Sequence, residues 1–593
     1  DIFQDSLAAS TFNINDGSFA EERGSIKLDD DGADGGGGGW TPPSSGGGGG
    51  GGSTVGNNFS ISGTAATGAA ISSGSVEAKC KSGTGTATTN YDGTFTVDIS
   101  NGLLPCMLKA TDPVSNLSLH SVVETGATTT NISPATELVT ATLLGNTPSL
   151  VFADFSSSAQ EKISTSNIAN AVATFQTATA VLGSDADMTG IDVMKGGLTA
   201  ATELAPGNPA DKKIDALMSA LAAADKKVSD LTTFMKSATS SADAVSGLRS
   251  VVGNAVDSLP SCPNARSGDV WVFGIVGGAP LAYTADFKNM RLTKQSTNTS
   301  YTINQVLDSA NAVVPCAFSS TIGGVSYEYR ISDGGLIIAY TPSGGMLVIP
   351  AQKNHKLTDS SFAGTYPAIA FIKSKTSSLR FALPIRFEID TAGKLTGYSC
   401  DLTKNIPDCL TVVNDTNKDD VNCVANVDGT FSCSSSASGF QSTAALYLTG
   451  SQSTLLMSIT NMNVGNASYE GMVVMTKAGR VSLPTVGMTS PAGSTWNIGS
   501  SGSTVTTSYS YASTVTSVNS SKNSFSTTVT IPGFDSAVSE HYLDTPATGF
   551  LYSENSISKA IQLRSPSGWA VAANKMSGGS NYSNWVASIR VPR

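Results

Sequence analysis

The chain has 593 residues, which is enough for about three to five domains with separate cores. Only 14% of the residues are charged and 40% are hydrophobic, so the composition is not that of a disordered chain. The net charge of −11 argues against a nucleic-acid partner, because phosphate binding requires clustered Lys and Arg.

Residues 1–57 are predicted to form an extension outside any domain, containing the glycine runs 35–39 and 46–52. Such runs act as flexible tethers unless neighbouring copies hold them in place. The extension carries two short alternating patches with the apolar side chains Phe12, Ile14, Ile26 and Leu28. These side chains either complete a sheet of an identical subunit by strand addition or belong to a disordered tail.

The chain contains neither an apolar leader at Asp1 nor an apolar run of about 18 residues, so we expect no transmembrane helix. For an exported protein, this means that a signal peptide has been removed.

Residues 58–130 alternate between apolar and polar positions in short segments, which predicts a small β-sandwich. The predicted strands are 59–63, 75–80, 94–98 and 107–110. The segment Thr89-Asn-Tyr-Asp-Gly-Thr-Phe-Thr-Val97, with Ser62-Gly-Thr-Ala65 and Gly74-Ser-Val-Glu77, resembles carboxypeptidase-regulatory-like (transthyretin-like) domains. The resemblance covers roughly this one unit. It implies a non-catalytic sandwich module of the kind common on secreted and surface proteins.

Residues 131–260 are predicted to form a bundle of about four helices. Ser133 and Asn208 each precede a proline and are suitable helix caps. Two apolar stripes follow at helical spacing: Ile168, Val172, Phe175, Ala178 and Leu182, and Ile214, Leu217, Leu221, Val228, Leu231 and Met235. We expect each stripe to lie on one helix.

The segment 133–140 at the start of this bundle resembles the corresponding join in large bacterial surface lipoproteins with glycine-rich N-termini. Those proteins carry a lipidated cysteine just before the glycine tract. This chain has no cysteine there, so we do not expect lipid anchoring.

Residues 261–593 read as β-structure throughout and are divided into predicted domains 261–360, 361–490 and 491–593. A glycine, an aromatic residue and an apolar strand recur in this order. The three copies are Ser267-Gly-Asp-Val-Trp-Val-Phe273, Phe362-Ala-Gly-Thr-Tyr-Pro-Ala-Ile-Ala-Phe371 and Pro491-Ala-Gly-Ser-Thr-Trp-Asn-Ile498. The recurrence predicts two or three antiparallel sandwich or barrel units.

Eight cysteines pair sequentially into short loops in our prediction: Cys80–Cys106, Cys262–Cys316, Cys400–Cys409 and Cys423–Cys433. A three-residue turn at 427–429, with Gly429 in the left-handed conformation, places Cys423 opposite Cys433 at a separation that a disulfide tolerates. The alternative is eight buried reduced thiols. Paired cysteines indicate an oxidising, extracellular compartment.

The sequence contains few of the residues and motifs that are typical of enzymes. The chain has three histidines, each in a different predicted unit, and no motif for a serine or cysteine nucleophile, a zinc protease or a phosphate-binding loop. We predict no catalytic residue and no cofactor, with one exception for calcium. Asp415, Asn417 and Asp419 offer oxygen ligands at alternate positions, like the first half of a calcium loop. The second half of such a loop is absent, so a solvated turn is the preferred interpretation.

The sequence thus predicts a multi-domain, mainly β chain: a small sandwich, a helical bundle, then two or three antiparallel units. We expect an extracellular structural subunit of a bacterial surface assembly or filament, associating with identical subunits. The alternatives are a monomeric adhesin that binds glycan or matrix, and a secreted hydrolase with an unrecognised carboxylate pair.

Overall fold

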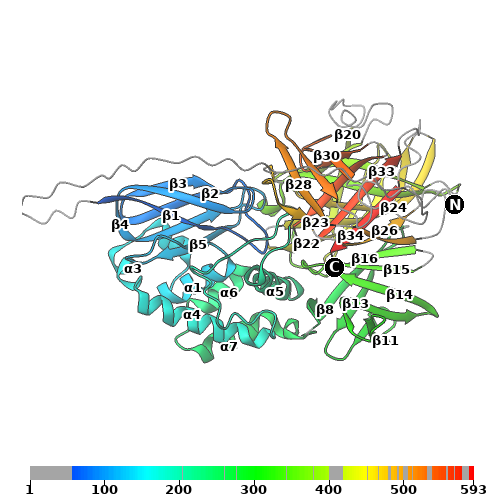
Figure 1. The fold of residues 1–593 in the computed structure, drawn as a ribbon. Helices are drawn as coiled ribbons and strands as arrows, with labels where there is room; N and C mark the ends of the chain where they lie inside the picture. Colours follow the sequence, from blue (N-terminus) through cyan, green and yellow to red (C-terminus); the bar gives the residue numbers. More distant parts are fainter. Residues whose placement is uncertain are drawn as a thin grey trace, which may run out of the picture.

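The computed structural model describes residues 56–592, except 204, 260, 276, 342–343, 378–379, 400–417, 451, 465, 479–482, 491–492, 499–504, 511, 530–536, 556–557, 567 and 577–585. Its mainly β architecture agrees with the prediction. A sandwich and a helical layer lie at one end of the molecule, and three antiparallel sheets lie at the other (Figure 1). Within the described residues, no helix is both long and apolar enough to cross a bilayer.

The sandwich is organised around one long strand. Its strands are β1 (Asn57–Thr64), β2 (Ser75–Ser82), β3 (Thr84–Thr88), β4 (Thr94–Thr111) and β5 (Ser118–Val123). The first half of β4 pairs with β1, and the second half pairs with β2 and β5. The predicted strands 94–98 and 107–110 are therefore one strand that belongs to both layers.

The helical layer packs against β5 and continues towards the sheets. Its helices are α1 (Pro134–Leu144), α2 (Pro148–Ala153), α3 (Ser157–Lys162), α4 (Thr165–Thr179), α5 (Pro209–Ala223), α6 (Val228–Met235) and α7 (Ser241–Val252), with short 3-10 turns η2 (Ala180–Leu182) and η3 (Gly253–Val256). Ser133 and Asn208 cap α1 and α5 as predicted, each accepting a backbone N–H.

The second apolar stripe does not lie on one helix, so that expectation is wrong. Asp225 has a φ of 55° and ends the helical path between α5 and α6. Its carboxylate accepts the backbone N–H groups of Lys353 (2.8 Å) and Asn354 (2.9 Å). The chain therefore turns here to bind the segment that follows β16.

The first rolled sheet follows the short hairpin β6 (Ser258–Leu259) and β7 (Cys262–Arg266). It comprises β8 (Gly268–Gly274), β9 (Leu281–Asp286), β10 (Arg291–Lys294), β11 (Thr299–Thr302), β12 (Asn304–Leu307), β13 (Val313–Ile322), β14 (Val325–Ile331), β15 (Ile337–Thr341) and β16 (Gly344–Pro350). β11 and β12 are the two ends of the strand order, yet only Ile303 separates them in the chain. The sheet therefore curls until its ends meet.

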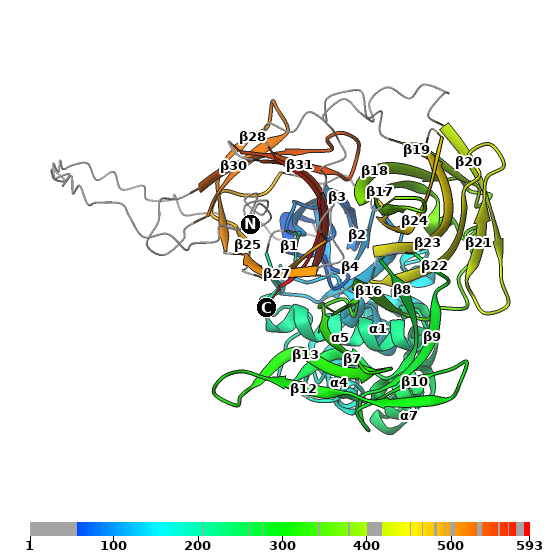
Figure 2. The same ribbon diagram turned by 90° about the vertical axis from the view of Figure 1, so that its right-hand side faces the viewer.

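A closed barrel follows the 3-10 turn η4 (Ser360–Phe362). Its strands are β17 (Gly364–Ser374), β18 (Arg380–Ile389), β19 (Leu395–Ser399), β20 (Lys418–Ala425), β21 (Phe431–Ser434), β22 (Gln441–Thr449), β23 (Gln452–Val464) and β24 (Ala467–Thr476). The last rolled sheet has ten strands. They are β25 (Thr489–Ser490), β26 (Gly493–Ile498), β27 (Val505–Ser510), β28 (Ser513–Asn519), β29 (Ser524–Val529), β30 (Ala537–Leu543), β31 (Leu551–Glu554), β32 (Ser558–Ser565), β33 (Trp569–Met576) and β34 (Val586–Pro592). Figure 2 shows both of these units end-on as rings beside each other.

The recurring sequence motif lies on an early strand of each unit: the first strand of the first two units (β8 and β17) and the second strand of the last one (β26). In every unit that strand pairs with the last one: β8 with β16, β17 with β24, and β26 with β34. Among the described strands, only the sheet of β17–β24 is a closed barrel, whereas the other two strand orders end at β11 and β12 and at β25 and β27. The three antiparallel sheets agree with the predicted barrel or sandwich units. Outward side chains such as Trp271 and Phe273 of β8 join the closed barrel in one apolar core, together with Trp569 of β33.

Candidate functional site

Three of the predicted cysteine pairs are disulfides in the structure: Cys80–Cys106, Cys262–Cys316 and Cys423–Cys433. Cys80 faces Cys106 across β2 and β4, and Cys423 faces Cys433 across β20 and β21. Gly429 has a φ of 87°, and the Asn426 N–H donates to Thr430 O at 2.8 Å, so the predicted turn forms. Cys400 and Cys409 lie outside the described residues.

Most of the other predicted site residues also lie outside the described part of the chain. This holds for the candidate interface residues Phe12, Ile14, Ile26 and Leu28 and for the candidate calcium ligands Asp415 and Asn417. The third candidate ligand, Asp419, lies in β20 and accepts hydrogen bonds from the hydroxyls of Ser435 and Ser438. In the described residues, no group of three His, Cys, Asp or Glu side chains is arranged to hold a metal ion.

The three histidines occupy separate buried positions. His120 Nδ1 lies 2.8 Å from Glu137 Oε2 and joins the sandwich to α1. His355 Nε2 lies 3.7 Å from Asp225 Oδ1. His541 lies in β30 of the last rolled sheet, 2.7 Å from both Thr527 Oγ1 and Ser553 Oγ and stacked on Phe525.

The Ser553–His541 pair has the composition of a nucleophile and its base, but burial weakens the base. Loss of solvent around the imidazole lowers the pKa of His541 to about 3, and Arg564 adds to this shift. A base with this pKa has little tendency to take a proton from a serine at neutral pH. We therefore interpret the cluster as a hydrogen-bonded part of the interior.

This pKa predicts a specific pH dependence of stability. His541 takes up its proton in the unfolded chain below about pH 6.5 but stays neutral in the fold until about pH 3. Its stabilising contribution is complete above pH 6.5 and decreases as the pH falls, by up to about 1.4 kcal/mol per pH unit. Urea unfolding of the wild type and of His541→Gln between pH 7 and pH 4 should give converging free energies of unfolding. Parallel curves would contradict the assignment.

A second buried titratable cluster lies where α5 meets the turn after β14. Desolvation raises the pKa of Asp211 to about 7 and also raises the pKa values of Asp215 and Asp333. Asp211 is fully buried and accepts the Ala201 N–H at 2.9 Å. The fold therefore binds protons at these carboxyl groups more readily than the unfolded chain does, so their linkage to stability has the opposite sign to that of His541.

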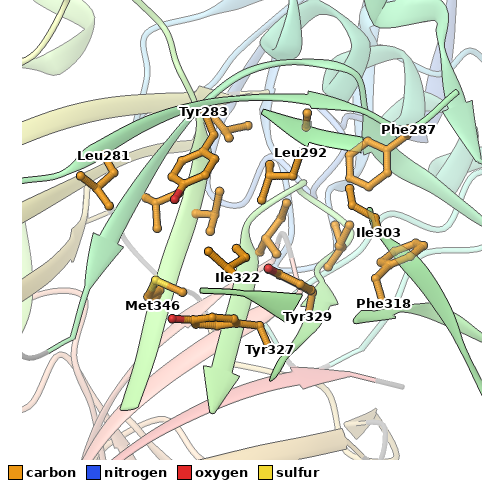
Figure 3. Close-up of a pocket in the computed structure, with 16 residues that line it drawn as sticks. Leu281, Tyr283, Phe287, Leu292, Ile303, Phe318, Ile322, Tyr327, Tyr329 and Met346 are labelled. Atoms are coloured by element: carbon orange, nitrogen blue, oxygen red, sulfur yellow. The ribbon is translucent and has the colours of Figure 1, made fainter. Parts of the chain in front are cut away.

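The interior of the first rolled sheet contains a cavity of about 110 Å³ (Figure 3). Alternate residues of the strands point into it, as the register requires: Val270 pairs with Tyr283, and Val348 with Val272. The complete lining is Val270, Val272, Leu281, Tyr283, Ala285, Phe287, Leu292, Ile303, Phe318, Ile322, Tyr327, Tyr329, Ile331, Ile337, Met346 and Val348. It contains no charged side chain.

The two ends of the cavity differ. At one end, Cys262 and Ala265 of β7 belong to the same buried apolar cluster and cover the interior. At the other end, Leu281 lines the cavity and is 41% exposed, so the cavity reaches the surface there. Val325, the first residue of β14 at this end, is also 41% exposed. The cavity is therefore a pocket with a floor and a mouth.

Sequence reasoning missed this pocket. The alternation at Leu281, Tyr283 and Ala285 marks a strand with one apolar face, but it does not say whether that face meets another layer or encloses a space. Only the closure of the sheet decides this, because inward side chains from all its strands must be counted together.

No protein-family model and no curated protein sequence matches this chain. The functional argument therefore rests on the residues and their geometry.

Proposed function

We propose that the chain is an extracellular structural subunit of a bacterial surface assembly, without catalytic activity. The strongest support is the cysteine pairing: the three described disulfides join neighbouring segments, and such bonds persist in oxidising compartments. Residues 58–130 would be its carboxypeptidase-regulatory-like module. The N-terminal extension would join one copy to the next.

The units contact one another through buried apolar and polar side chains, as expected for a structural subunit. Tyr91, in the turn before β4, packs with Phe525 and Leu543 of the last rolled sheet, and its hydroxyl donates to Glu203 at 3.0 Å. Gln352 is buried and bridges two further units: its amide donates to Ala222 O (3.2 Å) and Leu448 O (2.9 Å). Buried polar links of this kind fix the orientation of domains, because breaking them leaves unsatisfied groups.

Electron microscopy of the purified full chain tests the proposal. We expect ordered oligomers or filaments, in which apolar residues of the extension complete the sheet of a neighbour. Ile14→Asp with Ile26→Asp should yield monomers, because inserted apolar side chains do not tolerate a charge. The matched control, Asn13→Asp with Ser25→Asp, adds the same charge at adjacent positions and should assemble like the wild type.

Monodisperse wild-type monomers at high concentration, by light scattering, would refute assembly. Equal behaviour of the two charged variants would show that the extension is not the joining segment.

A further inference from the structure

The pocket of the first rolled sheet has the properties of a binding site rather than a packing defect. Folded interiors leave few spaces larger than a water molecule, and an apolar cavity in a core destabilises the protein. Here the space reaches the surface beside Leu281 and lies among three tyrosines. The closed barrel beside it, by contrast, carries fully buried side chains such as Tyr366 and Met457.

The size of the pocket limits the ligand. A dry apolar cavity of about 150 Å³ in another protein accepts benzene. The volume of about 110 Å³ therefore suits one aromatic ring or a short alkyl chain, with further atoms extending through the mouth.

The polar atoms of the pocket define the rest of the ligand. The Tyr329 hydroxyl is already bonded to Ser320 at 2.5 Å. Within the part of the chain that the structure describes, the hydroxyls of Tyr283 and Tyr327 have no hydrogen-bond partner. Figure 3 shows both side chains reaching towards the same space. Burial raises the pKa of Tyr283, which keeps this phenol neutral. An uncharged lining disfavours a charged ligand, whereas two neutral phenols can bind a hydroxyl or carbonyl group.

We propose that the interior of β8–β16 binds a small uncharged amphiphile, consisting of one aromatic ring or short alkyl chain with a single hydroxyl or carbonyl group held by Tyr283 and Tyr327. This site is independent of assembly through the N-terminal extension.

Calorimetric titration of the full chain with p-cresol and with toluene tests the proposal. Both compounds fit the apolar space, but only p-cresol reaches the two phenols, so p-cresol should bind more tightly. Ala285→Phe places a ring inside the pocket and should abolish binding of both. The matched control, Ser300→Phe, adds the same ring on the exposed face of β11 and should bind like the wild type.

The double variant Tyr283→Phe/Tyr327→Phe keeps the shape of the pocket and removes only the two hydroxyls. It should bind p-cresol about tenfold more weakly and toluene unchanged, because it removes both hydrogen bonds to the hydroxyl of p-cresol. This variant decides the question if Ala285→Phe does not fold. The proposal fails if the wild type binds neither compound, if Ala285→Phe binds both normally, or if the double variant discriminates as the wild type does.

Discussion

Replacement of both Cys262 and Cys316 by alanine is expected to lower the free energy of unfolding by about 4 kcal/mol. The two residues are 54 apart in sequence, and a cross-link that closes a longer loop restricts the unfolded chain more strongly. The bond also lies at the covered end of the pocket, where Cys262 is completely buried. Urea unfolding of the oxidised proteins, followed by circular dichroism, measures the change.

The hairpin disulfide Cys423–Cys433 provides the matched control, because its residues are only 10 apart. Its double alanine variant should lose less, about 3 kcal/mol in the same chain-entropy account. Equal losses, or a larger loss for the hairpin, would show that the effect arises in the folded state rather than in the unfolded chain.

Substitution of Arg266 by methionine is expected to cost about 3 kcal/mol or more. This side chain is only 6% exposed, and its guanidinium donates to the carbonyls of Leu182 (2.8 Å), Ala216 (3.4 Å) and Ala255 (3.5 Å). Methionine fills a similar volume but removes the charged donor from all three carbonyls, and each hydrogen bond to a charged group contributes roughly 1.5–3 kcal/mol.

Hydrogen exchange localises this effect. Amide protons of η2 and η3, whose carbonyls Arg266 holds, should exchange faster in Arg266→Met. Arg291→Met removes an exposed arginine from β10 and should change the stability by less than about 0.5 kcal/mol. Unchanged exchange at η2 and η3 would mean that the guanidinium does not hold the helical layer to β7.

The features that the sequence predicts well are local ones. The turn before Gly429 and the cap at Ser133 depend on a few neighbouring residues, so their chemistry is complete within a short segment. The disulfide at Cys423 follows from that turn. The strands β8, β17 and β26 are also recognisable from the sequence, because each carries the same glycine and aromatic pattern.

The features that were missed depend on distant partners. No residue near Asp225 in the sequence indicates a left-handed conformation between two apolar helical segments. The Asp225 carboxylate accepts the N–H groups of Lys353 and Asn354, which are distant in sequence. Arg266 looks like an ordinary polar residue at a strand end, yet it holds three separate helical segments. The pocket can be predicted only when the register of all the strands in the rolled sheet is known.

The pairing of an early strand with the last strand in each unit delays the completion of these sheets during synthesis. β8 cannot complete its hydrogen bonds until β16 has left the ribosome, and contacts so distant in sequence form slowly. The same delay recurs for β17 and β26, so three unfinished edges with similar sequences follow one another along the nascent chain. Until its partner strand is synthesised, each edge offers unpaired N–H and C=O groups with which another chain can pair.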